Sequence, residues 1–171
     1  MELRTIYRRA GDGAVLMCPP HPDYGGSMYD VRLERISRKL VANGISTLRF
    51  DYRSVDSAVE DARTCFDWLR NRHSRVGVLG YSFGSTVAMH LCGDAMVFIS
   101  PVESIPFDCG SPKLVVIAKR DQFVSLKRSL EIAKAIPEPK GISILDTDHL
   151  YTGKFDVLSE IVAKFFKTEL V

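Results

Sequence analysis

The sequence lacks an excess of charge of either sign, since 23 lysines and arginines stand against 21 aspartates and glutamates in 171 residues. This balance gives no electrostatic reason to expect a nucleic acid or an anionic membrane as the main partner. Glycine and proline are near average and no short period recurs, which excludes collagen, coiled coils and low-complexity chains. Long hydrophobic runs are absent too, because a run such as Leu114–Ala118 has the length of a strand rather than of a membrane span.

Closely spaced cysteines are also missing, and no CxxC pair occurs among Cys18, Cys65, Cys92 and Cys109. Without a close pair of ligands, a metal site built from these thiols is not expected. The N-terminal stretch alternates charged and apolar residues and has no continuous apolar segment, which argues against a secretory signal. We therefore expect four reduced thiols in a cytoplasmic protein, with no metal and no organic cofactor.

The residues that are present have the balance of a globular protein, with 46% hydrophobic and 26% charged. Most of the strand candidates are apolar almost throughout, as expected of buried parallel strands. The candidates are Leu3–Arg8, Ala14–Cys18, Ile45–Phe50, Val76–Gly80, Met96–Ser100, Leu114–Ala118 and Ile142–Asp146. Amphipathic segments typical of helices alternate with them at Asp30–Asn43, Ser57–Arg72, Ser82–Cys92, Leu126–Ile136 and Phe155–Lys167. This alternation predicts an α/β fold, a three-layer α/β/α sandwich with a mostly parallel sheet, in one domain over residues 1–171.

The most informative segment is Gly80-Tyr81-Ser82-Phe83-Gly84, a G-x-S-x-G sequence between an expected strand and an expected helix. This is the setting of a nucleophile elbow, in which a sharp turn lifts the serine hydroxyl clear of the sheet. Glycines on both sides fit the close approach of strand and helix. The sequence therefore predicts Ser82 as a nucleophile. The alternative is a glycine-rich turn whose serine only caps the helix.

A serine nucleophile needs a base, and His149 is the best placed of the histidines. It follows the last expected strand, at the carboxyl edge where catalytic groups of open α/β sheets gather. His90 is expected inside the helix that Ser82 begins, and His73 at the opposite end of the nucleophile strand. His21 is a possible neighbour of Ser82, and a surface-loop histidine without chemistry is the alternative for His149.

The acid that orients the base should follow another strand, between the serine and the histidine in chain order. Asp121 fits, because it leaves the apolar strand Leu114–Ala118. A turn-forming aspartate is the alternative interpretation of this residue. The competing carboxylates are Glu103, Asp108, Asp146 and Asp148. Those next to His149 in sequence are less suitable, since adjacent side chains tend to point apart.

The order Ser82, Asp121, His149 over an alternating α/β pattern resembles the α/β-hydrolase superfamily. The segment Cys18–Met28 is similar to the H-P-H-P-x-x-G-G-[ST]-M loop of small dienelactone-hydrolase-like serine hydrolases. Thr47–Arg53 resembles the strand that these proteins carry before a glycine-rich turn, and Asp148-His149 resembles their terminal D-H motif. The resemblance extends from about Ala14 to Gly153.

The resemblance implies an oxyanion hole made of the backbone N–H group of Phe83 and one from the first loop. His21, Asp23 and Tyr24 are the candidates there, since proline has no N–H, and alignment to the loop favours His21. The His21 side chain is expected to pack in the loop, and Tyr24 and Tyr81 to flank the site. Two departures occur at the mouth of the site. Pro19 replaces the first histidine of the loop, and Ser54–Ala58 replaces the glycine-rich stretch.

The implied activity is cleavage of a small ester or thioester through an acyl-serine intermediate, with a small-molecule acyl substrate as the partner. The segment Pro101–Lys113 is too short for a helical cap, so an open site is expected. Two alternatives stay open. One is a catalytically inactive α/β-hydrolase-like binding protein, and the other is a flavodoxin-like protein that binds an anion at Gly80–Gly84.

Overall fold

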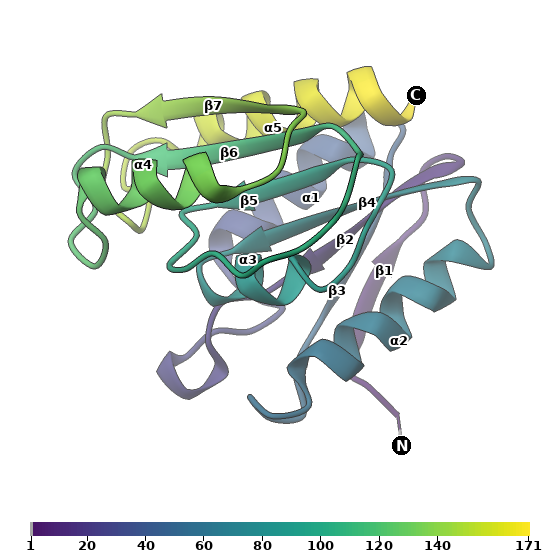
Figure 1. Ribbon diagram of the computed structural model, residues 1–171. Coiled ribbons are helices and arrows are strands. Elements are labelled where there is room, and N and C mark those ends of the chain that lie inside the picture. Colours follow the sequence, from purple (N-terminus) through teal and green to yellow (C-terminus); the bar gives the residue numbers. More distant parts are fainter. Residues whose placement is uncertain (1) are drawn as a thin grey trace.

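The protein, described over residues 2–171 by a computed structural model, is built on a seven-stranded sheet with helices on both faces (Figure 1). The strands are β1 (Thr5–Arg8), β2 (Gly13–Cys18), β3 (Ser46–Phe50), β4 (Arg75–Tyr81), β5 (Met96–Ile99), β6 (Lys113–Ala118) and β7 (Lys140–Leu145). Their order across the sheet is β1-β3-β2-β4-β5-β6-β7. Only the β1–β3 pair among them is antiparallel. The predicted mostly parallel sheet is therefore confirmed.

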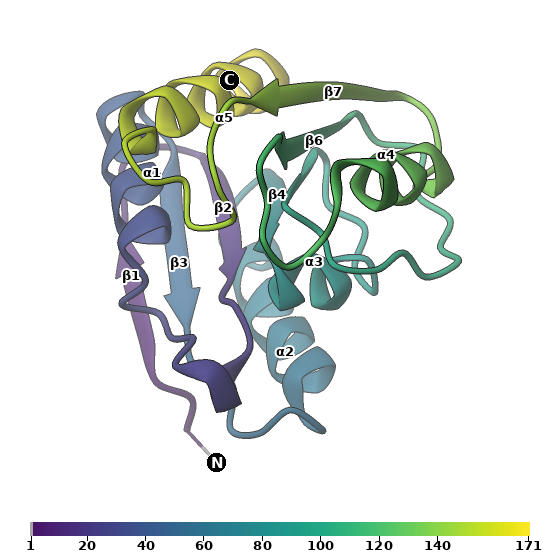
Figure 2. The same ribbon diagram turned by 90° about the vertical axis from the view of Figure 1, so that its left-hand side faces the viewer.

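The helices form two layers, one on each face of the sheet (Figures 1 and 2). One layer holds α1 (Val31–Ala42) and α5 (Phe155–Leu170), which pack against each other. The other layer holds α2 (Ala58–Arg70), α3 (Phe83–Ala88) and α4 (Leu126–Ala135), and a 3-10 helix η1 (Pro22–Tyr24) lies between β2 and α1. The predicted three-layer α/β/α arrangement is therefore confirmed.

Successive side chains of β4 point to opposite faces of the sheet, so this one strand contributes to the hydrophobic core under each helix layer. Val76 and Val78 pack into the core under α2, α3 and α4, whereas Leu79 and Tyr81 pack into the core under α1 and α5. Side chains of a strand point to opposite faces in turn, so a strand covered on both sides is apolar throughout. Burying each of these large side chains stabilises the fold by roughly 1.5–3 kcal/mol.

The parallel register brings several strand ends to one edge of the sheet. Strands β4, β5, β6 and β7 lie side by side, and each continues at its carboxyl end into a loop or helix. Ser82 follows β4, Asp121 follows β6 after two intervening residues, and His149 lies in the turn after β7. The sheet order therefore gathers three residues that are far apart in sequence.

The structure corrects two expectations. The helix expected over Ser82–Cys92 ends at Ala88, so His90 lies in the turn after α3 and not inside a helix. Four reduced thiols were expected, but Cys92 and Cys109 form a disulfide, while Cys18 and Cys65 are free and buried. The disulfide joins the turn after α3 to the segment between β5 and β6.

The parallel strands β3-β2-β4-β5-β6 have the order 2-1-3-4-5 that a flavodoxin-like sheet also has. This sheet differs from the flavodoxin-like alternative in its additional edge strands, the antiparallel β1 and the parallel β7. Within residues 2–171, no helix is both long and apolar enough to cross a membrane.

Candidate active site

Ser82 occupies the sharp turn between β4 and α3, with φ 55° and ψ −121°. Positive φ is costly for a residue with a side chain, and its persistence here means that the surroundings impose it. A Cβ on Gly80 would lie 2.1 Å from the carbonyl oxygen of Gly84, and one on Gly84 would lie 2.1 Å from the carbonyl oxygen of Cys18. The two glycines thus allow strand and helix to approach closely enough to make the turn.

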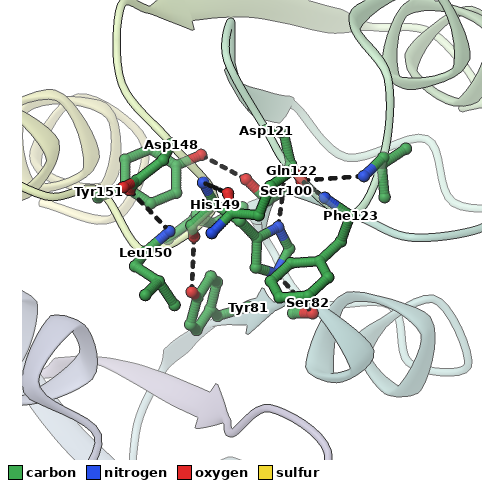
Figure 3. A network of polar contacts seen from close by, with 12 residues as sticks. Tyr81, Ser82, Ser100, Asp121, Gln122, Phe123, Asp148, His149, Leu150 and Tyr151 are labelled. Carbon is green, nitrogen blue, oxygen red and sulfur yellow. Dashed lines mark hydrogen bonds and ion pairs between the residues drawn. The ribbon is translucent and has the colours of Figure 1, made fainter.

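The structure joins the three predicted residues in a chain of hydrogen bonds (Figure 3). His149 Nε2 lies 3.0 Å from Ser82 Oγ, and His149 Nδ1 lies 2.6 Å from Asp121 Oδ2. An ionised carboxylate only accepts hydrogen bonds, so Nδ1 donates to Asp121 and Nε2 is left to accept from the serine hydroxyl. The imidazole and the carboxylate are almost fully buried, at 7% and 2% exposure.

Asp121 is held as an anion by the chain around it. Its Oδ1 accepts hydrogen bonds from the backbone N–H groups of Phe123 at 2.8 Å and Val124 at 2.9 Å. Burial by itself would raise the pKa of Asp121, but the hydrogen bond from His149 and these two N–H groups outweigh it and hold the pKa below its ordinary value. Asp121 is therefore ionised at neutral pH and can stabilise a positive imidazole.

The competing carboxylates have other partners. Asp146 pairs with Arg120 on the surface at 2.8 Å, and Asp148 accepts hydrogen bonds from Leu150 and Thr152 within its own turn. Glu103 lines the cavity in front of Ser82, and Asp108 is exposed. Of the five carboxylates considered from the sequence, Asp121 is the one that the structure bonds to the imidazole.

The other histidines lie apart from this chain of hydrogen bonds. His73 Nε2 bonds the Tyr7 hydroxyl at 2.9 Å, and its Nδ1 bonds the backbone carbonyl of Asp12. His21 Nδ1 accepts from the backbone N–H of Asp23, and its ring packs 4.8 Å from that of Phe83. The His21 side chain thus shapes the first loop, in agreement with the packing role expected for it.

Two backbone N–H groups of residues that line the cavity are candidate donors to an oxyanion. Phe83 is the first residue of α3, and His21 precedes η1, and both residues line the cavity. Within residues 2–171, neither N–H group has a hydrogen-bond acceptor. Free donors next to a nucleophile are what stabilisation of a tetrahedral intermediate requires. The assignment of both groups to an oxyanion hole remains a prediction.

The cavity in front of Ser82 has a volume of about 730 Å³. Its aromatic wall is formed by His21, Tyr24, Phe83 and Phe123, with Tyr24 and Phe123 largely exposed at 87% and 71%. The lining also contains Asp30 and Arg32, which form an ion pair, together with Tyr81 and Leu150. The sequence signalled Tyr24 and Tyr81, but nothing in it singled out Arg32, because an arginine in an amphipathic helix is usually a solvated one.

At the two places where the sequence departs from the family pattern, local hydrogen bonds stabilise the backbone. The carbonyl of Pro19 accepts from the buried hydroxyl of Tyr52 at 2.8 Å, which fixes the start of the first loop. In place of a glycine-rich turn, Ser57 Oγ donates to Asp61, and Arg53 pairs with the same buried carboxylate at 2.6 Å. Side-chain contacts thus stabilise this turn, whereas a glycine-rich turn would rely on the conformational freedom of its backbone.

A comparison with known protein families finds no match. Among curated proteins, an uncharacterized protein of Rickettsia prowazekii is 24% identical over 185 residues, covering 90% of this chain and 78% of that protein. The similarity extends along most of both chains, but the relative brings no assigned activity.

Solved structures are much more informative about the fold. XC6422 from Xanthomonas campestris, a serine hydrolase without a lid, matches with a TM-score of 0.86 at 21% identity over 98% of this chain and 89% of that one. The chain has an α/β-hydrolase fold. A serine hydrolase homologue from Coxiella burnetii matches with a TM-score of 0.82 at 20% identity over 95% and 91% of the two chains. Est1E from Butyrivibrio proteoclasticus, solved with ferulic acid bound, matches with a TM-score of 0.83 at 13% identity over 98% and 95%.

The α/β-hydrolase fold explains the short connection after β5. The segment between Ile99 and Lys113 contains no helix or strand, so this segment forms no cap domain. The predicted minimal fold without a cap is therefore confirmed. The resemblance to the dienelactone-hydrolase-like group, which rests on the loop Cys18–Met28, stays a prediction.

Proposed function

We propose that the protein is a serine hydrolase that cleaves a small ester or thioester. The observation that carries the proposal is the chain of hydrogen bonds from Ser82 through His149 to Asp121, at 3.0 and 2.6 Å. In this arrangement a base reaches the nucleophile and a buried carboxylate fixes the tautomer of the base. The fold agrees with the proposal, since several structures that share it are described as esterases or serine hydrolases.

The reaction has two halves that use the same residues. Ser82 Oγ attacks the substrate carbonyl carbon while its proton passes to His149 Nε2, and the carbonyl oxygen becomes an oxyanion. The tetrahedral intermediate collapses when His149 returns the proton to the departing alcohol or thiol, leaving an acyl-serine. A water molecule, deprotonated by His149, then attacks the acyl carbon and releases a carboxylic acid and free Ser82.

Charge develops at two points during these steps, and a group in the structure faces each of them. The positive imidazole of His149 is stabilised by the Asp121 carboxylate. The oxyanion is placed between the N–H groups of Phe83 and His21, and loss of one such donor costs about 3 kcal/mol of transition-state stabilisation. No metal or organic cofactor takes part in this scheme.

The size of the cavity favours a small substrate over a polymer. A volume of about 730 Å³ holds a small acyl group and its leaving group together. The exposed rings of Tyr24 and Phe123 offer apolar contact to either group. Esters and thioesters are favoured over amides because an amine leaving group needs stronger protonation by His149.

A fluorophosphonate probe tests the proposal directly, because it labels an activated serine. Wild-type protein should be labelled, and Ser82→Ala should abolish labelling and the hydrolysis of p-nitrophenyl esters. Ser104→Ala is the matched control, since Ser104 lies outside the cavity lining, and it should be labelled like the wild type. A panel of p-nitrophenyl esters and acyl-CoA thioesters of increasing length then identifies the acyl group and the leaving group.

The alternative is a binding protein that has kept the fold but lost the chemistry. It predicts a folded wild-type protein that is neither labelled by the probe nor active on any ester of the panel. That combination of results would contradict the proposed function.

A further inference from the structure

His149 sits in a tight turn whose own bonds do not fix the imidazole. The carboxylate of Asp148 accepts the N–H groups of Leu150 and Thr152, and Thr147 Oγ1 donates to the carbonyl of Thr152. Tyr151 completes the turn at φ 58°, an uncommon value for a residue with a side chain. These contacts close the turn on itself, so the orientation of the imidazole toward Ser82 depends on contacts from other elements.

Tyr81 supplies one of these outside contacts, at the last residue of β4 and directly before Ser82. Its hydroxyl donates a hydrogen bond of 2.7 Å to the backbone carbonyl of His149 (Figure 3). Its ring lies 5.6 Å from the imidazole at an interplanar angle of 30°. Burial raises the pKa of Tyr81 far above its ordinary value, so the hydroxyl stays protonated and remains a donor.

Arg32, from the first turn of α1, supplies the next contact. Its Nη1 donates to the carbonyl of Leu150 at 3.2 Å, and its guanidinium carbon lies 4.9 Å from the centroid of the Tyr81 ring. Asp30, the N-cap of α1, holds the other side of the guanidinium through Nε at 3.1 Å and Nη2 at 2.5 Å. Asp30 thus holds the guanidinium of Arg32 in place against both the turn and the Tyr81 ring.

Consecutive backbone groups of the turn are therefore held from three different elements. The N–H of His149 donates to Gln122 Oε1 at 3.0 Å, its carbonyl accepts from Tyr81, and the next carbonyl accepts from Arg32. Fixing the peptide groups on both sides of a Cα leaves its side chain little freedom beyond χ rotation. The Asp121 hydrogen bond then sets that rotation.

We propose that Tyr81 is a positioning residue for His149, with Arg32 holding the Tyr81 ring and the following carbonyl in place. This inference rests on the proposed function, in which His149 is the base. The end of β4, which carries Ser82, would then also hold His149, so one strand end sets the distance between the nucleophile and the base.

Tyr81→Phe tests the proposal, because phenylalanine keeps the ring and its stacking and removes only the hydroxyl. We expect kcat on p-nitrophenyl acetate, and the maximal rate of fluorophosphonate labelling, to fall roughly tenfold with KM almost unchanged, since a misplaced catalytic group costs about 100-fold per ångström. Arg32→Lys keeps the charge but cannot reach Asp30 and Leu150 with one planar fork, and it should act in the same direction.

Tyr7→Phe is the matched control. Tyr7 also loses a hydroxyl hydrogen bond to a histidine in this variant, the one to His73 at 2.9 Å, but at the opposite end of the sheet. Its kcat should equal that of the wild type. If Tyr81→Phe retains the wild-type kcat, or if Tyr7→Phe lowers kcat equally, the positioning role is wrong and the hydroxyl serves stability alone.

A second measurement does not depend on activity. The proton shared by His149 Nδ1 and Asp121 should give a far-downfield proton resonance in ¹⁵N-histidine-labelled protein, assigned by its loss in His149→Gln. We expect this resonance to broaden through faster water exchange in Tyr81→Phe and to be unchanged in Tyr7→Phe. An identical resonance in both variants would overturn the proposal. A wild type without hydrolase activity, but with this difference between variants, would refute the proposed function and leave the positioning of His149 intact.

Discussion

At the scale of single residues, the Asp121 carboxylate has both of its oxygens engaged. One accepts from His149 and the other from the backbone of Phe123 and Val124. The side chain therefore cannot turn away from the imidazole without breaking several hydrogen bonds. The neutral amide of an asparagine has the same shape but presents a donor as well as an acceptor.

Asp121→Asn should leave the fold intact and lower kcat roughly 10⁴-fold, because the amide favours the wrong imidazole tautomer and does not stabilise the positive ring. Steady-state hydrolysis of p-nitrophenyl acetate measures the loss, and circular dichroism checks the fold. Asp146→Asn is a suitable control, since Asp146 forms an exposed ion pair with Arg120 that should affect kcat less than about twofold. If the asparagine at 121 retains most of the activity, another carboxylate orients the base.

At the scale of elements, the turn from β4 into α3 depends on how closely two backbones approach. The Gly84 Cα faces the carbonyl of Cys18 at the end of β2, with no space for a methyl group. Gly110, by contrast, has no heavy atom within 4 Å of the position that a Cβ would take. Replacement by alanine adds the same methyl group at both glycines, but the position is crowded at Gly84 and open at Gly110.

Gly84→Ala should destabilise the protein by about 3 kcal/mol, because the carbonyl it meets belongs to the backbone and cannot rotate away as a side chain would. Gly110→Ala should change the free energy of unfolding by less than about 0.5 kcal/mol. Urea unfolding followed by fluorescence gives both values. Equal stability of the two variants would show that the turn relaxes without cost.

Most of the elements could be predicted from the sequence because buried parallel strands are apolar throughout and the helices between them are amphipathic. The same logic placed Ser82, Asp121 and His149 together, since each follows a strand at the carboxyl edge. The early end of α3 could not be predicted, because Met89 and Leu91 continue the apolar pattern past Ala88 into a buried turn. The contacts of Arg32 could not be predicted either, because its partners Tyr81 and Leu150 are far from it in sequence.

At the scale of the whole molecule, the disulfide between Cys92 and Cys109 ties the turn after α3 to the irregular segment between β5 and β6. The cysteines are 17 residues apart in sequence. Their pairing could not be predicted because the wide spacing of the cysteines in sequence favoured reduced thiols. It depends on the sheet, which brings the two segments to one place.

Reduction of this disulfide should lower the free energy of unfolding by about 3 kcal/mol, the loop-closure value for a loop near this length. Guanidinium unfolding with and without reductant measures the change, and the Cys92→Ser, Cys109→Ser double variant should not respond to reductant. Thiol titration of denatured, unreduced protein should find only Cys18 and Cys65. Four reactive thiols in that titration would show that the pair is open.

The lack of a cap domain between β5 and β6 also has a kinetic consequence. Where a segment must swing aside before substrate enters or product leaves, that motion often limits turnover. The connection between β5 and β6 carries no element that could gate the site in this way. Under the proposed function, the chemical step should then limit turnover, and kcat for a small acetate ester should stay constant as sucrose raises the solvent viscosity. A kcat that falls in proportion to viscosity would instead make product egress the slow step.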